Sequence, residues 1–307
     1  MPLIKVTSPS FSKNATLRDE LLSRFPNAVL NDAGQALAGD ALAAFLDGAD
    51  GAVIGLETVD DALLARMPSL RIVAKYGVGL DSIDQEACAR RGVRIGWTGG
   101  VNRVSAAEMA MGFMLGLNRN LFATAFQMRD GVWNKNGGRQ LSGRTVGIIG
   151  TGHIGKEVAR MLAPFGCRVL GNDLLDMAAW YAANGVEPAS KERIWDEAEV
   201  ITLHVPCTPS TRAMINAETL RRMRPDAVLV NTCRGEVVDQ AALKRALVEG
   251  WIAGAATDVY ESEPPTDMEF LRLPNLVCTP HIGGNAVEAV LAMGRSAITH
   301  LESHFLK

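Results

Sequence analysis

Three glycines with the spacing Gly150, Gly152 and Gly155 stand between an apolar run and a segment with helical character. Gly150 permits a tight turn, Gly152 lets the backbone approach a pyrophosphate, and Gly155 lets a helix pack closely on the preceding strand. The start of the helix offers N–H groups to phosphate oxygens. The loop, with His153 and Ile154 between its glycines, therefore predicts phosphate binding. An ordinary glycine-rich turn is the alternative.

An aspartate, Asp173, stands at the end of the next apolar run. This is close to the spacing at which an acidic side chain accepts hydrogen bonds from the ribose hydroxyls of a dinucleotide. Its carboxylate would repel the extra phosphate of NADP, and residues 174–177 contain no arginine or lysine. Together with the glycine loop, Asp173 predicts a site for NAD. An aspartate that only caps a turn is the alternative.

The elements that must position these residues alternate along the chain. Short apolar runs and amphipathic stretches follow one another, as is typical of strand–helix–strand units. In the first part we expect strands at 3–6, 52–54 and 71–74 and helices from about 17 and over 60–67. In the second part we expect strands at 146–149, 168–172, 200–204, 227–231 and 253–257, and a helix over 156–163. The predicted class is α/β, with two doubly wound parallel-sheet domains, Rossmann-like or flavodoxin-like, and a cleft between them.

Two glycine-rich turns, 97–100 and 283–285, are candidate hinges, because the chain contains no long flexible linker. If the chain crosses between domains at both turns, the first domain is discontinuous. We therefore predict a substrate-binding domain of residues 1–98 and 286–307, with a final helix over 287–305, and an NAD-binding Rossmann domain of residues 99–285.

The composition excludes several classes of protein. The 307 residues are 48% hydrophobic and 21% charged, which suits two packed domains and excludes a disordered chain. The net charge of -3, without long basic runs, predicts no nucleic-acid or membrane partner and favours a small molecule. Five scattered cysteines, with no metal-ligand spacing, predict reduced thiols and no metal. Because no signal or membrane-spanning run is present, we expect a cytoplasmic protein.

Several further blocks make the chain resemble the D-isomer-specific 2-hydroxyacid dehydrogenases, and among them the D-3-phosphoglycerate dehydrogenase-like branch. Besides the glycine loop, these blocks are residues 75–81, 100–102 with 105–108, 204–206, 231–235, 258–260 with 263–264, and 279–284. Their order matches the family, although the first 60 or so residues carry little of the resemblance. The resemblance implies an NAD-dependent enzyme that transfers a hydride between nicotinamide and C2 of a small D-2-hydroxy acid or 2-oxo acid.

The resemblance also implies three catalytic residues, Arg234, Glu263 and His281. The planar fork of Arg234 can hold a carboxylate and polarise the adjacent carbonyl oxygen. His281 can give a proton to that oxygen during reduction or remove the hydroxyl proton during oxidation, and Glu263 would orient its ring. From residue types alone, a surface ion pair and a structural histidine are the alternatives.

The binding residues that the resemblance implies fall into two sets. Residues expected to bind substrate are Lys75, Tyr76, Gly77, Val78 and Gly79, whose turn would present N–H groups to the substrate carboxylate. A plain strand-to-helix turn is the alternative there. Besides the glycine loop and Asp173, those expected to bind the cofactor are Ser105, His204, Val205, Pro206, Thr211, Thr232, Cys233, Arg234, Asp258, His281 and Gly283.

The resemblance leaves the substrate and the assembly open. Residues 75–84 and 100–109 are most similar to those of phosphoglycerate-type enzymes, for which Lys75, Arg103, Lys135 and Arg139 are candidate phosphate ligands. Reduction of glyoxylate or hydroxypyruvate is the leading alternative, and phosphite oxidation is a more distant one. An alternative of another class is an NAD(H)-binding corepressor that acts as a scaffold. The resemblance implies a homodimer joined largely through residues 108–133, and a helix buried within its own domain is the alternative for this region.

Overall fold

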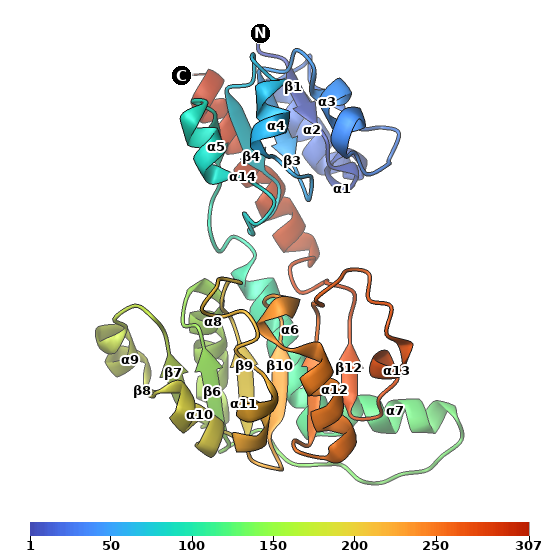
Figure 1. Ribbon diagram of the computed structural model, residues 1–307, viewed down its shortest axis with the longest axis vertical. Coiled ribbons are helices and arrows are strands. Elements are labelled where there is room, and N and C mark those ends of the chain that lie inside the picture. Colours follow the sequence, from blue (N-terminus) through green and yellow to red (C-terminus); the bar gives the residue numbers. More distant parts are fainter. Residues whose placement is uncertain (307) are drawn as a thin grey trace. The chain divides into compact units, whose positions relative to one another are not determined.

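The computed structural model describes residues 1–306, so Lys307, the last residue of the predicted first domain, lies outside it. The chain divides into two compact units (Figure 1). One comprises Met1–Asn102 and the segment that begins at Val287, and the other comprises Arg103–Ala286. The predicted boundaries fall four residues and one residue earlier along the chain. The assignment of a substrate role and a cofactor role to the two units stays a prediction.

The smaller unit is built on a five-stranded parallel sheet with the order β2-β1-β3-β4-β5. Its strands are β1 (Ile4–Val6), β2 (Val29–Leu30), β3 (Gly51–Ile54), β4 (Ile72–Lys75) and β5 (Arg94–Gly96). Every residue of β3 and β4 is buried, as expected for parallel strands covered on both faces. The strand order reverses between β1 and β3, and ligands of open parallel sheets bind at the carboxyl ends of the strands beside such a point.

Helices cover both faces of this sheet. On one face lie α1 (Pro9–Lys13), α2 (Ala15–Arg24) and α14 (Val287–Phe305), and on the other lie α3 (Gly39–Leu46), α4 (Asp61–Ala65) and α5 (Gln85–Arg90). Figure 1 shows the red helix α14 among the blue and cyan elements of the N-terminal segment. The predicted final helix is confirmed with the bounds expected. The close packing of α14 on α2 depends on Gly294, since a Cβ there would lie 2.3 Å from Leu17 Cδ1.

The larger unit contains a seven-stranded parallel sheet with the order β12-β11-β10-β9-β6-β7-β8. The strands are β6 (Thr145–Ile149), β7 (Arg168–Asn172), β8 (Val186–Pro188), β9 (Val200–Leu203), β10 (Val228–Asn231), β11 (Gly254–Thr257) and β12 (Leu276–Cys278). The strand order reverses between β6 and β9, so the carboxyl ends of these two strands mark the expected ligand site of this sheet. The predicted strand at 200–204 is one residue too long, because β9 ends at Leu203 and His204 follows it.

One face of this sheet packs on α6 (Arg103–Asn118), α8 (His153–Leu162) and α9 (Ala178–Asn184), and the other on α10 (Lys191–Glu197), α11 (Ala217–Arg222), α12 (Gln240–Glu249) and α13 (Met268–Leu271). Two 3-10 turns, η1 (Ala163–Phe165) and η2 (Gly235–Val237), complete the unit. The helix α7 (Leu121–Arg129) has no buried residue. Within residues 1–306, no helix combines the length and apolar character that crossing a membrane requires.

Candidate active site

The glycine loop lies at the carboxyl end of β6, and packing restricts two of its three glycines. Gly150 has a φ of +90°, and a Cβ on it would lie 2.5 Å from the carbonyl oxygen of His204. A Cβ on Gly155 would lie 2.1 Å from the carbonyl oxygen of Gly150. A Cβ on Gly152, which caps α8, would meet no described atom within 4 Å. The loop backbone is therefore open only at Gly152, where the first N–H groups of α8 can bind an anion.

Asp173 follows β7 directly and is bonded to the glycine loop. Its Oδ2 accepts hydrogen bonds from Thr151 N at 2.7 Å and Thr151 Oγ1 at 3.2 Å, and its Oδ1 accepts one from Leu175 N at 3.0 Å. The buried Thr151 hydroxyl also bonds with the Tyr181 hydroxyl at 2.8 Å. Thr151 and Tyr181 were not predicted. A carboxylate offers about four acceptor positions, so Asp173 can accept these three hydrogen bonds and still accept one from a ribose hydroxyl.

Two buried polar atoms at this edge of the sheet have no hydrogen-bond partner among residues 1–306: Nδ1 of His204, which follows β9, and Oγ1 of Thr232, which follows β10. Nε2 of His204 bonds with Thr202 Oγ1 at 3.0 Å. Burial lowers the pKa of His204 to about 3, so its ring is neutral near pH 7. Buried polar atoms are rarely left unpaired, and a ligand at the carboxyl ends of β9 and β10 would satisfy both.

The turn after His204 carries three more of the predicted cofactor-binding residues. Val205 packs toward the glycine loop, because a Cβ on Gly150 would lie 2.8 Å from Val205 Cγ1. The buried hydroxyl of Thr211 donates to Pro206 O at 2.6 Å and accepts from Thr208 N at 2.8 Å. The Thr211 hydroxyl thereby holds the backbone of the turn at Pro206 and Thr208.

Arg234 follows β10, and its backbone is fixed by Asn231, the last residue of that strand. Asn231 Nδ2 donates to Arg234 O at 3.0 Å, and Asn231 Oδ1 accepts from the N–H and the thiol of Cys233, both at 3.1 Å. Burial raises the pKa of Cys233 to about 11, which keeps the thiol protonated as a donor. The guanidinium of Arg234 donates through Nη1 to Cys233 O at 2.6 Å. The hydrogen bonds of Asn231, at the end of β10, therefore fix the backbone position from which the Arg234 side chain extends.

The buried carboxylate of Asp258, directly after β11, organises the loop after β12. Its Oδ1 accepts from Thr279 Oγ1 at 2.5 Å and Ile282 N at 2.8 Å, and its Oδ2 accepts from Gly283 N at 2.6 Å. The carbonyl of Gly283 in turn accepts from Ser105 Oγ, on α6, at 2.7 Å. Asp258, Gly283 and Ser105, all predicted to bind the cofactor, therefore form one connected network around residue 281.

His281 and Glu263 form a direct pair. His281 Nδ1 lies 2.8 Å from Glu263 Oε2, and Glu263 Oε1 accepts from Tyr260 N at 3.1 Å. Burial raises the pKa of the Tyr260 hydroxyl, which remains a donor and bonds to Thr279 O at 2.9 Å. Because Nδ1 is occupied by the carboxylate, Nε2 is the nitrogen of His281 through which a proton can be exchanged.

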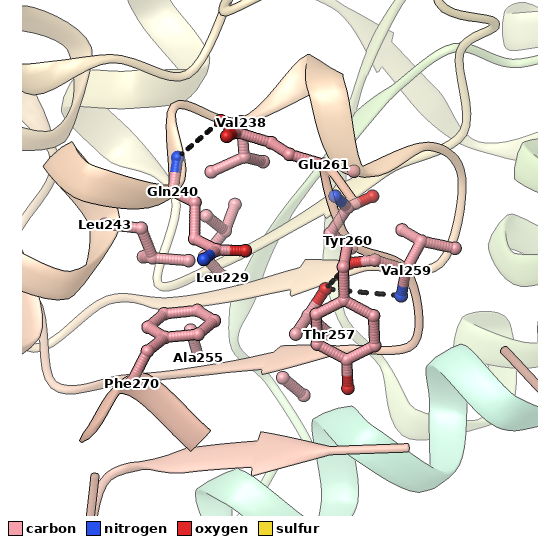
Figure 2. A pocket seen from close by; sticks show the side chains of 13 residues that line it. Leu229, Val238, Gln240, Leu243, Ala255, Thr257, Val259, Tyr260, Glu261 and Phe270 are labelled. Carbon is pink, nitrogen blue, oxygen red and sulfur yellow. Dashed lines mark hydrogen bonds between the residues drawn. The ribbon is translucent and has the colours of Figure 1, made fainter. Parts of the chain in front are cut away.

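A small cavity of about 10 Å³ lies beneath the loop that leads to Glu263. Figure 2 shows its lining, in which Gln240 N donates to Glu261 at 3.0 Å and Thr257 Oγ1 donates to Val259 O at 2.6 Å. This space is close to that of one water molecule. It is too small for a substrate and belongs to the packing under the site.

The predicted substrate turn follows β4 in the smaller unit. Tyr76 N continues the sheet pairing by donating to Ile54 O at 2.8 Å, and Gly77 then has a φ of +147°. No hydrogen bond among residues 1–306 uses the N–H groups of Gly77, Val78 or Gly79. Consecutive N–H groups left free in a turn form a cradle for an anion.

Lys75, the last residue of β4, is buried and its ammonium is engaged within the smaller unit. Nζ donates to Gly55 O at 2.5 Å and to Ser82 Oγ at 3.3 Å. A Cβ on Gly77 would lie 3.1 Å from Lys75 Cε, so the lysine stem passes directly beneath the turn. In this arrangement Lys75 supports the turn.

The residues at the carboxyl edge of the larger sheet fit NAD. The open backbone at Gly152, followed by His153 and Ile154 in the first turn of α8, suits a pyrophosphate. Asp173 suits the adenosine ribose, and the unpaired Nδ1 of His204 and Oγ1 of Thr232 lie along the same edge. These features fit the pyrophosphate and a ribose of a dinucleotide, and the two unpaired atoms remain available to a ligand at the same edge.

Comparison with known proteins agrees with this geometry. Residues 111–283 match the family model of the D-isomer specific 2-hydroxyacid dehydrogenase, NAD binding domain. A glyoxylate reductase of Korarchaeum cryptofilum is 39% identical over 252 residues, which cover 80% of this chain and 76% of the relative. This chain is a D-isomer-specific 2-hydroxyacid dehydrogenase. It is an oxidoreductase that uses NAD.

Two further relatives of the dehydrogenase show its range of similarity. A D-3-phosphoglycerate dehydrogenase of Mycobacterium tuberculosis is 38% identical over 234 residues, which cover 76% of this chain but only 44% of that relative. The D-lactate dehydrogenase of Aquifex aeolicus, solved with NAD and lactic acid, superimposes with a TM-score of 0.85 at 26% identity, covering 98% of this chain and 95% of that one. The fold and the family are therefore shown, and the substrate is open.

Proposed function

We propose that this dehydrogenase interconverts a small, non-phosphorylated 2-oxo acid of the glyoxylate or hydroxypyruvate type and its 2-hydroxy acid. The catalytic part of this proposal is supported by the 2.8 Å contact between His281 Nδ1 and Glu263 Oε2, on the same sheet edge as the glycine loop that is proposed to bind NAD. NAD, when bound, supplies the hydride acceptor or donor at C4 of its nicotinamide.

In this proposal His281 is the acid and base. During reduction its Nε2 gives a proton to the substrate carbonyl oxygen, and during oxidation the same nitrogen removes the proton of the hydroxyl group. Glu263 accepts a hydrogen bond from Nδ1, which fixes the tautomer and the ring orientation. Glu263 is itself held by the N–H of Tyr260, so the pair is positioned by the backbone after β11.

Arg234, in the larger unit, is proposed to bind the substrate carboxylate. The guanidinium is a permanent cation that can bind a carboxylate and polarise the neighbouring carbonyl oxygen, which stabilises the charge that develops there. The N–H groups of the turn at Gly77–Gly79, in the smaller unit, have no acceptor among residues 1–306, and we propose that they donate hydrogen bonds to a substrate carboxylate. Neither role needs a proton to move.

The partners of three of the four candidate phosphate ligands favour a substrate without phosphate over the 3-phosphoglycerate-like substrate expected from the sequence. Lys75 donates to Gly55 O and Ser82 Oγ. Arg139 pairs with Asp226 at 2.7 Å, and because Asp226 precedes β10, this pair lies at the amino edge of the sheet, opposite to His281. Arg103 lies 3.5 Å from Glu157.

The test is a substrate panel of glyoxylate, hydroxypyruvate, 2-oxobutyrate and 3-phosphohydroxypyruvate with NADH and NADPH. We expect hydroxypyruvate or glyoxylate to give the highest kcat/KM, and NADH to be preferred because of Asp173. A higher kcat/KM with 3-phosphohydroxypyruvate would contradict the substrate proposal and leave the dehydrogenase assignment intact.

We further propose that the enzyme is a homodimer. The helix α7 buries none of its own residues, and Leu121, Phe126, Met128 and Trp133 are exposed on it or just after it. A groove of about 680 Å³ lies beside it, with Leu117, Phe122, Leu273 and Val277 in its lining. The exposed apolar side chains of one copy could therefore enter the groove of a second copy, and the reverse, across a twofold axis.

All five thiols are free, which suits the cytoplasm expected from the sequence.

A further inference from the structure

We propose that Trp97 is a positioning residue for the substrate carboxylate, because its indole N–H fixes the peptide between Val78 and Gly79. This inference rests on the function proposed above for the turn at Gly77–Gly79. It concerns a residue that takes no part in hydride or proton transfer.

The contact joins two neighbouring strand ends in the smaller unit. Trp97 Nε1 donates to Val78 O at 2.7 Å, although the two residues lie 19 positions apart. Trp97 directly follows β5, and the turn directly follows β4, its partner in the sheet. The indole therefore reaches across the carboxyl edge of the sheet to the middle of the turn.

The direction of one N–H group follows from this contact. In a trans peptide the C=O and the next N–H point in opposite directions. Because Val78 O is directed toward Trp97, the N–H of Gly79 is directed away from it. That N–H, like those of Gly77 and Val78, has no acceptor among residues 1–306. The indole thus determines the orientation of a donor that the protein itself does not use.

The rest of the turn is held by other contacts, which leaves its centre to Trp97. The N–H of Tyr76 is fixed by Ile54 O before the turn, and Lys75 passes beneath Gly77. The position of Trp97 is fixed by its neighbour Thr98, whose hydroxyl bonds with His300 Nε2, on α14, at 2.9 Å. Trp97, which anchors the turn, is therefore linked through Thr98 to α14 of its own unit.

The exposure of Trp97 argues against a role in packing alone. It remains 39% exposed, whereas the large side chains of the core, such as Phe11 and Phe25, are almost fully covered. An indole that keeps this much contact with solvent contributes less burial than its size allows. Its N–H contact to the turn is the specific feature that phenylalanine would lack.

The test compares W97F with the wild type on an acid and on its uncharged ester. For hydroxypyruvate or glyoxylate, we expect KM to rise about tenfold, as for a misplaced hydrogen bond to a charged group, with kcat within about twofold. The KM for NADH and the kcat/KM for methyl glyoxylate, the uncharged ester of glyoxylate, should change less than about twofold. Inhibition by oxamate should weaken in parallel with the acid.

The matched control is W251F, which removes an indole donor bonded to Glu249 at 2.9 Å in the larger unit and should leave all these constants unchanged. If W97F does not fold, W97M replaces it, since methionine also lacks the donor and fills space flexibly. An unchanged KM for the acid, or equal losses for acid and ester, would overturn the inference. A wild type that reduces no 2-oxo acid would instead overturn the proposed function.

Discussion

His281 combines a close partner with an uncommon backbone conformation. Its φ of +54° lies in the left-handed region, which costs a residue with a Cβ roughly 1–2 kcal/mol. The hydrogen bonds that Asp258 accepts from Thr279, Ile282 and Gly283 fix the backbone on both sides of it. A conformation of this kind persists only where the surroundings determine it, and here it turns the imidazole toward Glu263.

Substitution of His281 should separate catalysis from cofactor binding. H281A removes the proposed proton donor, so we expect kcat to fall about 100- to 10,000-fold. The dissociation constant for NADH, measured by fluorescence titration, should remain within about threefold of the wild type, because the glycine loop and Asp173 are untouched. H304A, at the end of α14, serves as the control and should keep full turnover. Full activity of H281A would remove the proton-transfer role.

Acid should destabilise the protein through His204. Burial lowers the pKa of this ring to about 3 in the folded state, against roughly 6.5 in an unfolded chain. Below about pH 6.5 the unfolded chain therefore binds a proton that the folded protein does not, so the stability contributed by the neutral ring is complete above that pH and is lost progressively toward pH 3.

The measurement is urea unfolding of the wild type and H204N at pH 7.5 and pH 5. The advantage of the wild type in free energy of unfolding should shrink by about 1–2 kcal/mol at the lower pH. An equal advantage at both pH values would show that His204 does not titrate in this way.

At the scale of elements, the turn between β6 and α8 offers a matched pair of glycines. A Cβ on Gly155 would lie 2.1 Å from a backbone oxygen, whereas a Cβ on Gly152 would meet no described atom. G155A should therefore lower the free energy of unfolding by about 1–3 kcal/mol, as overpacking does. G152A should keep the stability of the wild type but raise the KM for NADH at least about tenfold, because the methyl group would occupy the proposed pyrophosphate position. The reverse order of effects would contradict the assignment.

The elements that sequence reasoning found are the long apolar ones. The five strands predicted in the larger unit match β6, β7, β9, β10 and β11 within one residue at each end, since each contains at least three consecutive buried residues. The strands β2, β5, β8 and β12 were missed; each contains only two or three residues, which is too short for a periodic pattern. The short helices α1, α3 and α5 were missed as well.

The residues of the site also fall into those that local sequence patterns indicate and those that they do not. The glycine loop was identifiable from local spacing, and its φ values and close contacts follow from that spacing. The pairing of His281 with Glu263 came only from the family resemblance, because nothing in the sequence indicates that residues 18 positions apart meet. The bond from Thr151 to Asp173 depends on the adjacency of β6 and β7, and no sequence pattern revealed it.

At the scale of the whole molecule, the proposed dimer predicts a change of mass on substitution of α7 and the residues after it. Phe126 and Trp133 are exposed, and a charge on each would be buried without a partner at the proposed contact. In sedimentation equilibrium we expect the wild type to have twice the 32.9 kDa mass of one chain. The double variant F126E/W133E should have the mass of a single chain. Wild-type protein that sediments as one chain at micromolar concentration would exclude this dimer.

The place of α14 has a consequence for the order of events during synthesis. The first 102 residues leave the ribosome long before Val287–Phe305, which contribute Ala297, Ile298 and Leu301 to the same apolar cluster as β1 and β4. Until that last helix emerges, the part of this sheet face that α1 and α2 do not cover stays exposed. The region translated second contains all of its own helices and can complete its fold earlier, so the part of the polypeptide that is made first is the last to mature.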